Sequence, residues 1–168
     1  MSDYIVRRKK AISILALVLV AVTMGLALAH ALELPGKLRL NRDTYVAVQA
    51  IYYPGFTIGG LVGELGGLIV LLALLFLTPY GTPRFRWTMA AFGFLISTHA
   101  VYWLVTHPVN NFWVKDIDIA GPGAAFFSFL SGKGGEWAHM RDVWEYSHVA
   151  RACLAMASLV SMAIALTL

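Results

Sequence analysis

Hydrophobic positions fall in four long stretches, and most charged residues lie between them. The first stretch, residues 11–29, is 19 residues long and carries no charged side chain. A helix needs roughly 20 apolar residues to cross a bilayer. The pattern therefore predicts four membrane-spanning helices, at about residues 11–33, 56–77, 87–107 and 145–168.

The composition agrees with this pattern. Of the 168 residues, 59% are hydrophobic and only 13% are charged, and the mean hydropathy is +0.71. Such values are typical of an integral membrane protein. Four helices and their loops use up the chain, so we expect one all-α membrane domain, a four-helix transmembrane bundle over residues 1–168. The basic start and apolar run resemble a signal peptide, but the run is longer than usual. We expect it to be retained as the first helix.

Basic residues are distributed unevenly between the ends of the predicted bundle. Residues 7–10 precede the first helix, and Arg84 and Arg86 lie in the short link between the second and third helices. Short segments rich in Lys and Arg stay in the cytoplasm. We therefore expect both termini to be cytoplasmic and the long loops, about residues 34–55 and 108–144, to be extracytoplasmic. The formal charge of +4 then needs no nucleic-acid partner.

Five ionisable side chains interrupt the apolar stretches or lie at their rim. They are His30, Glu64, His99, His148 and Arg151. An ionisable side chain in hydrocarbon is costly, so each needs a partner or a function. Successive helices run in opposite directions, and a helix rises about 1.5 Å per residue. All five side chains then fall in the outer third of the bundle, which predicts one polar site near its extracytoplasmic end.

Helical spacing adds two acidic residues to this site. Glu33 lies three residues after His30, and Glu145, His148 and Arg151 follow one another at intervals of three. Residues three apart share a helix face. We therefore expect Glu33 and Glu145 at the edge of the same site.

Glycines surround Glu64 on the second helix. Residues 59, 60, 63, 66 and 67 are all glycine, and their small-xxx-small spacing allows a neighbouring helix to approach closely. Residues 52–56, which contain a Pro-Gly pair, are interpreted as the turn into this helix. His107 and His139 lie near the predicted loops and are interpreted as exposed loop histidines.

A metal site is the functional interpretation of this constellation. The proposed ligands are His30, Glu64, His99 and His148. Glu145 and His148 have the Glu-x-x-His spacing of di-metal carboxylate bundles. Imidazole and carboxylate ligands favour iron or copper, with zinc as a further candidate. Glu33 and Glu145 would be additional or supporting ligands, and Arg151 would orient an anionic oxygen.

Three alternatives remain open. In a structural interpretation, Glu64 or Glu145 pairs with Arg151, and the histidines make hydrogen bonds that hold the helices together. In a haem interpretation, which ranks below the non-haem metal, two of the three histidines in the apolar stretches bind the iron and Arg151 contacts a propionate. Without a metal, one histidine would act as a general base on an acidic C–H group beside a carbonyl.

Four blocks of sequence resemble a known group of small membrane proteins. The blocks are residues 30–37, 52–56, 108–113 and 141–151. Together they are similar to the anthrone oxygenase-like family of four-helix membrane proteins. This resemblance implies oxygenation of a polycyclic phenolic ketone in some members of the family, and it implies no particular catalytic residues.

The sequence thus predicts an integral membrane oxidoreductase, metal-dependent and dioxygen-using, that acts on a small lipophilic phenolic or quinone-like substrate. The expected location is the bacterial inner (plasma) membrane, with the site facing the extracytoplasmic side. The expected partners are the lipid bilayer, the substrate, and a second copy of the chain or a larger membrane complex. The alternative functions are a non-enzymatic subunit with a structural or proton-carrying cluster, and a haem-binding electron carrier.

Overall fold

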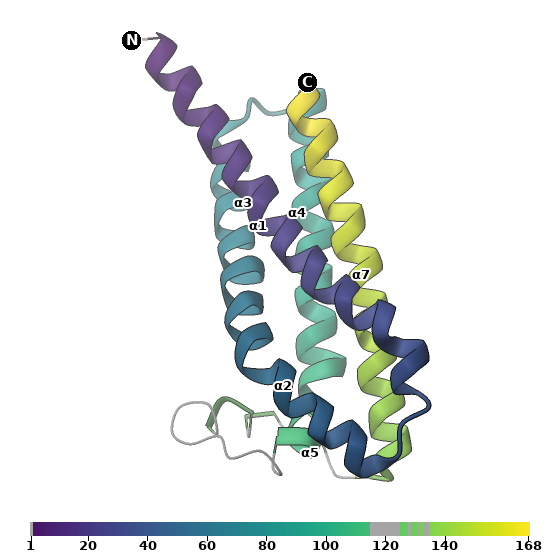
Figure 1. Ribbon diagram of the computed structural model, residues 1–168. Helices are drawn as coiled ribbons and strands as arrows, with labels where there is room; N and C mark the ends of the chain where they lie inside the picture. The colour runs from purple at the N-terminus through teal and green to yellow at the C-terminus, as the bar shows by residue number, and fades with distance from the viewer. Residues whose placement is uncertain (1, 115–124, 128, 131, 133–134) are drawn as a thin grey trace.

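The chain folds as a bundle of four helical rods (Figure 1). The computed structural model describes residues 2–114, 125–127, 129–130, 132 and 135–168, with side chains from Arg7 onward except that of Val114. Within these parts of the chain, the structure is helical apart from short turns and contains no strand. Each rod is long and apolar enough to cross a membrane. The predicted all-α, four-helix bundle is therefore confirmed.

Two of the rods are single helices and two are composite. The first is α1 (Ser2–Lys37) and the last is α7 (Trp137–Thr167). The second rod consists of α2 (Arg42–Gly60), the π-helix η1 (Leu61–Leu65) and α3 (Gly66–Leu77). The third consists of α4 (Pro83–Val101), the π-helix η2 (Tyr102–Thr106) and α5 (His107–Val114).

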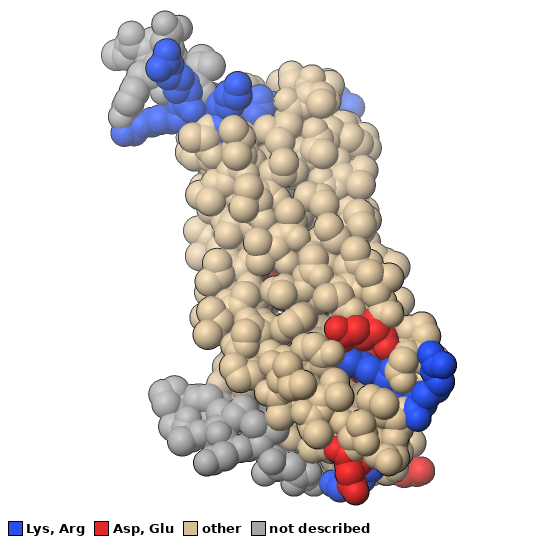
Figure 2. Space-filling view, viewed as in Figure 1, with Lys and Arg blue, Asp and Glu red and all other residues tan. Residues whose placement is uncertain are grey.

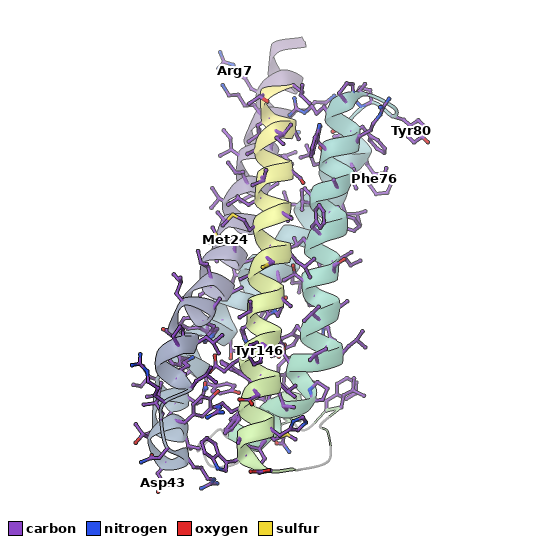
Figure 3. All side chains as sticks on the ribbon, turned by 90° about the vertical axis from the view of Figure 1, so that its right-hand side faces the viewer. Arg7, Met24, Asp43, Phe76, Tyr80 and Tyr146 are labelled. Carbon is purple, nitrogen blue, oxygen red and sulfur yellow. The ribbon has the colours of Figure 1, made fainter. Side chains whose placement is uncertain are left out.

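Both termini lie at one end of the bundle, as Figure 1 shows. In Figure 3, Arg7 lies near this end and Asp43 at the opposite end. On the face drawn in Figure 2, basic residues gather at the first end and mixed charges at the other, with a broad band of other residues between them. This is the charge distribution of a membrane protein. The cytoplasmic placement of the termini stays a prediction.

The second rod begins earlier than the sequence predicted. The side chain of Asn41 caps α2 by accepting a hydrogen bond from the backbone N–H of Thr44 at 2.9 Å. Residues 42–55, predicted as loop, are therefore helical, and the predicted turn at residues 52–56 is wrong. Pro54 lies inside the helix, where it removes one backbone hydrogen bond and favours a bend. Figure 1 shows α2 inclined to α3.

The other helix ends also extend beyond their predicted limits. The third rod continues through α5 to Val114, and α7 begins at Trp137 rather than near residue 145. Helix α7 packs against both α1 and α4. In the half of the bundle near the termini, the core is apolar and built from Ala16, Val20, Leu71, Leu74, Ala91, Leu95 and Met162.

Close approach of α1 to the glycine face of the second rod is confirmed. A Cβ atom on Gly63 would lie 2.8 Å from the Thr23 Oγ1 and 3.1 Å from the Thr23 backbone nitrogen. A Cβ on Gly67 would lie 2.9 Å from Cδ2 of Leu95, so α4 also approaches this face closely. Glycine at residue 63 therefore allows α1 to approach the backbone beside Glu64.

Two π-helical turns interrupt the second and third rods. Glu64 lies inside η1, and His99 lies in the last turn of α4, directly before η2. A π-turn widens the helix by one residue and is often found at functional sites. Here the two turns change the direction in which side chains leave neighbouring rods.

Candidate functional site

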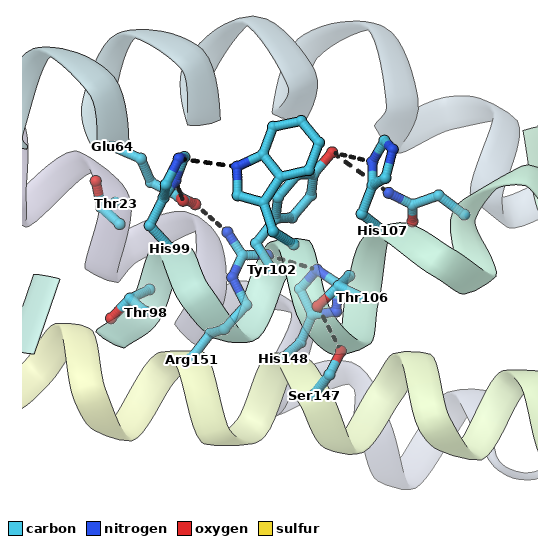
Figure 4. Close-up of polar contacts among 12 residues, drawn as sticks. Thr23, Glu64, Thr98, His99, Tyr102, Thr106, His107, Ser147, His148 and Arg151 are labelled. Carbon is cyan, nitrogen blue, oxygen red and sulfur yellow. Dashed lines mark hydrogen bonds and ion pairs between the residues drawn. The ribbon is translucent and has the colours of Figure 1, made fainter. Parts of the chain in front are cut away.

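Glu64 joins three rods of the bundle (Figure 4). Its side chain is buried, with 7% of its surface exposed. One carboxylate oxygen, Oε1, accepts a hydrogen bond from Nη2 of Arg151 on α7. The other, Oε2, lies 3.0 Å from Nδ1 of His99 on α4. Both carboxylate oxygens therefore have a protein partner, and the partner of Arg151 is Glu64.

The hydrogen bond from Trp103 shows which ring nitrogen of His99 carries the proton. The indole Nε1 of Trp103 donates a hydrogen bond to Nε2 of His99 at 2.9 Å. An indole N–H can only donate, so Nε2 is the acceptor and the neutral ring carries its proton on Nδ1. His99 therefore donates a hydrogen bond to Glu64, and the two form a carboxylate–imidazole dyad. The other ring nitrogen, Nε2, faces Trp103.

The same reasoning identifies the tautomer of His148. Its Nδ1 lies 2.8 Å from the backbone carbonyl of Trp144, and a carbonyl can only accept. The Nε2 atom then accepts a hydrogen bond from Nη1 of Arg151 at 3.2 Å. Arg151 thus holds Glu64 and His148 with its two terminal nitrogens. Its Nε is buried and has no hydrogen-bond partner within the described chain.

A second polar cluster surrounds Lys37 at the end of α1. Lys37 is 3% exposed, and its Nζ lies 3.0 Å from Glu33 Oε2 and 3.6 Å from Glu145 Oε1. Tyr45 donates a hydrogen bond to the same Glu145 oxygen at 2.8 Å. Lys37 also donates to His30 Nδ1 at 3.3 Å. His30 therefore carries its proton on Nε2 when neutral.

The two clusters meet at their histidines. The ring centroids of His30 and His148 are 4.5 Å apart, and both rings pack against the indole of Trp144. The structure therefore brings all seven predicted site residues into two adjoining clusters. The first contains Glu64, His99, His148 and Arg151, and the second contains His30, Glu33 and Glu145.

Sequence reasoning missed Lys37 and misplaced His107. Lys37 was assigned to a loop, although it lies seven residues after His30 and four after Glu33, on the same helix face. His107 is fully buried rather than an exposed loop residue. Its Nε2 donates to the backbone carbonyl of Phe129, and its Nδ1 accepts from the Tyr102 hydroxyl at 3.2 Å. It supports the wall of the site.

The ligand set in this arrangement does not fit a metal centre. Among the described residues, no three His, Cys, Asp or Glu side chains gather as a metal-binding group. The lone pairs of His30, His99 and His148 accept hydrogen bonds from Lys37, Trp103 and Arg151, as shown above. A metal would have to displace one of these donors. The iron, copper or zinc site stays an untested prediction.

A haem has no slot between the two histidines that face each other. His30 and His148 are in ring contact, so a macrocycle cannot lie between them. Both ring nitrogens of His99 are engaged. The arrangement therefore favours hydrogen-bonded imidazoles over axial haem ligands.

A cavity of about 730 Å³ opens beside the first cluster. Glu64, His99, His148 and Arg151 line part of it, and most of the remaining wall is aromatic or aliphatic. The aromatic lining residues are Tyr52, Tyr53, Phe56, Tyr102, Trp103, Phe126, Phe127 and Trp144. Its size is that of a small-molecule pocket. Searches of protein-family models, curated proteins and solved structures found no match.

Proposed function

We propose that the protein is an integral membrane oxidoreductase that uses dioxygen to oxidise a small lipophilic phenolic or quinone-like substrate. The observation that carries this proposal is the aromatic cavity that is lined in part by the Glu64–His99 dyad and Arg151. An apolar pocket with a few convergent polar groups is the usual form of a small-molecule site. The resemblance to the anthrone oxygenase-like family points to the same substrate class.

The rim of the cavity supports a lipophilic substrate. Three aliphatic lining residues are exposed: Ile58 by 66%, Leu61 by 63% and Leu65 by 46%. They lie on α2 and η1, at the level of the bundle that faces hydrocarbon in a membrane. A molecule dissolved in the bilayer reaches such an opening without crossing water, so the proposed substrate enters laterally.

His99 is the proposed general base. The carboxylate of Glu64 orients the ring and stabilises the imidazolium that forms, as in other carboxylate–imidazole pairs. The Nε2 lone pair of His99 is held by Trp103, which is half-buried and also lines the cavity. The substrate must therefore displace this indole before Nε2 can take a proton.

Arg151 is the proposed partner of the substrate oxygen. Arg151 lines the cavity, and its Nε–H is a buried donor without a partner in the described chain. When His99 removes a proton from a C–H group beside a carbonyl, negative charge moves to the carbonyl oxygen. A fixed guanidinium stabilises that charge in a water-poor site.

The proposed overall reaction converts one methylene group and one dioxygen molecule into one carbonyl group and one water molecule. The proton of the first C–H bond goes to His99, and the electron pair left on carbon forms a bond to dioxygen. The second C–H bond and the O–O bond then break. One oxygen atom stays as the new carbonyl, and the other leaves as water with the two hydrogens.

Oxygen consumption with anthrone as the probe tests this proposal. The His99→Asn variant keeps an N–H donor toward Glu64 but lacks the base nitrogen, and we expect a loss of at least about 100-fold in rate. Ser97→Ala is the control, because the Ser97 hydroxyl donates to the Gly93 carbonyl of its own helix. With isotope-labelled dioxygen, the product should carry one labelled oxygen. Equal rates in His99→Asn and the wild-type protein would refute the assigned base.

A structural or proton-carrying cluster is the second candidate. It is favoured by the complete pairing of Glu64, whose two oxygens are bound by Arg151 and His99. This function predicts no ligand binding in the cavity and no oxygen consumption with anthrone. Elemental analysis and an absorption spectrum of protein purified without chelator test the metal and haem predictions separately.

A further inference from the structure

One ring nitrogen of His30 has no hydrogen-bond partner. His30 lies on α1, is 4% exposed and lines the cavity together with Leu26 and Ala27 of the preceding turn. Its Nδ1 accepts a hydrogen bond from Nζ of Lys37, so the neutral ring carries its proton on Nε2. Nε2 makes no hydrogen bond within the described chain, and its neighbours do not cover it completely. A donor in a largely buried side chain needs an acceptor, and a ligand in the cavity would supply one.

The position of Lys37 shows where this N–H lies. Lys37 follows His30 by seven residues, toward the end of α1, and contacts Nδ1. Nε2 is on the far side of the imidazole ring from Nδ1, so it faces away from Lys37 and back along α1. Leu26 and Ala27 occupy that part of α1 and line the cavity. The open space beside Nε2 is therefore the cavity.

Lys37 is held against the other face of His30 by its own contacts. Its Nζ lies 3.0 Å from Glu33 Oε2 and 3.6 Å from Glu145 Oε1. The ring of Tyr52 lies 4.5 Å from the same nitrogen. An ammonium group donates hydrogen bonds and cannot accept them, so Nδ1 of His30 is the acceptor. A hydrogen bond to one ring nitrogen polarises the ring and strengthens donation from the other.

The rings around His30 offer Nε2 no acceptor. The centroid of the His148 ring is 4.5 Å from that of His30. Both nitrogens of His148 are engaged, Nδ1 with the Trp144 carbonyl and Nε2 with Arg151. The indole nitrogen of Trp144 only donates, and Phe56 has no polar side-chain atom. The acceptor for Nε2–H is therefore not supplied by these neighbours.

From this arrangement we infer that the Nε2–H of His30 donates a hydrogen bond to an oxygen of the substrate. The inference rests on the proposed function, because it takes the cavity as the substrate site. His30 and Arg151 line the same cavity, and His148 contacts both of them. Fixed N–H donors stabilise negative charge that develops on an oxygen. The substrate class is then an aromatic ketone or phenol whose oxygen acceptors meet two protein donors.

Two flat probes with the same ring skeleton test this inference. Anthraquinone carries two carbonyl oxygens, and anthracene carries none. Trp103 and Trp144 line the cavity, so quenching of tryptophan fluorescence in the purified full chain reports binding. The measured quantity is the ratio of the two dissociation constants. Comparison of this ratio between the wild-type protein and its variants cancels the difference in hydrophobicity of the probes.

The variants locate the effect. His30→Phe removes the donor but keeps an aromatic ring, and we expect the ratio to shift against anthraquinone on the order of fivefold to tenfold, as for one lost hydrogen bond. His30→Gln places an amide N–H near the position of Nε2 and should keep the wild-type ratio. Thr57→Val, a change of another polar cavity residue, should also keep it.

Nitrogen NMR of the wild-type protein with labelled histidine tests the part played by Lys37. His30, assigned by the signal that is lost in His30→Gln, should show a protonated Nε2 and an unprotonated Nδ1. A proton on Nδ1 would overturn the assignment of Lys37 as the residue that keeps Nε2 the donor.

The possible outcomes separate the two proposals. An unchanged ratio in His30→Phe, an equal shift in His30→Phe and His30→Gln, or binding of anthracene alone would overturn the donor at His30 and leave the cavity as a binding site. A donor that holds only water gives the first of these results. If neither probe binds to the wild-type protein, both the donor and the cavity's role as the substrate site are overturned.

Discussion

At the residue scale, the charges of the site are stabilised as pairs. Arg151 and Glu64 form a buried ion pair, with side chains that are 10% and 7% exposed. The free energy lost when two charges are removed from water is recovered only when both charges are present and paired. The pair therefore fixes α7 against η1 and also fixes the tautomer of His148. Its contribution to stability is visible only when one partner is removed without the other.

We expect Glu64→Gln to destabilise the protein by about 3 kcal/mol, because Arg151 then remains as a buried cation without its partner. The double variant with Arg151→Met should recover more than half of this loss, since both buried charges are gone. Reversible unfolding in mixed micelles measures both effects. Additive losses in the double variant would contradict the pairing.

At the element scale, the helices followed from the sequence because their apolar stretches are long and contain few ionisable residues. The depth of the site also followed, because alternating helix direction and the rise per residue fix the level of each side chain. Because Pro54 and Gly55 favour turns, the sequence predicted the start of the second rod too late. In the structure, packing of Tyr45 and Tyr53 into an aromatic core overrides that local tendency.

The π-turns η1 and η2 and the pairing within the site were not predictable. Hydrophobic periodicity cannot reveal the one extra residue of a π-helical turn. The choice between Glu64 and Glu145 as the partner of Arg151 depends on side-chain reach across three rods. That choice became visible only in three dimensions. The spacing of Lys37, seven residues after His30, could have predicted its role. It did not, because the sequence interpretation placed Lys37 in a loop.

Gly63 gives the clearest test of the packing between α1 and η1. We expect Gly63→Ala to destabilise the protein by about 1–3 kcal/mol, because the added Cβ would crowd the side chain and backbone of Thr23. Gly60→Ala is the matched control, since a Cβ at that position meets nothing within 4 Å. Thermal unfolding in detergent compares the two. Similar melting temperatures for both variants would contradict the close approach.

At the scale of the whole molecule, the site lies in the half of the bundle away from the termini. The two ends differ in charge: the end with the termini is basic, and the other carries mixed charges (Figure 2). If the basic end is cytoplasmic, as the positive-inside rule predicts, the cavity opens toward the outer leaflet. The orientation therefore decides from which leaflet the proposed substrate enters.

Cysteine labelling tests this orientation. Arg7 and Asp43 lie near opposite ends of the bundle (Figure 3), and the Asp43 side chain is 93% exposed. After Cys153→Ala removes the native thiol, we expect Asp43→Cys to react with a membrane-impermeant maleimide in intact cells, because the extracytoplasmic end faces the reagent. Arg7→Cys should react only after the membrane is permeabilised. The reverse pattern would place the site in the cytoplasmic half, so the substrate would enter from the inner leaflet.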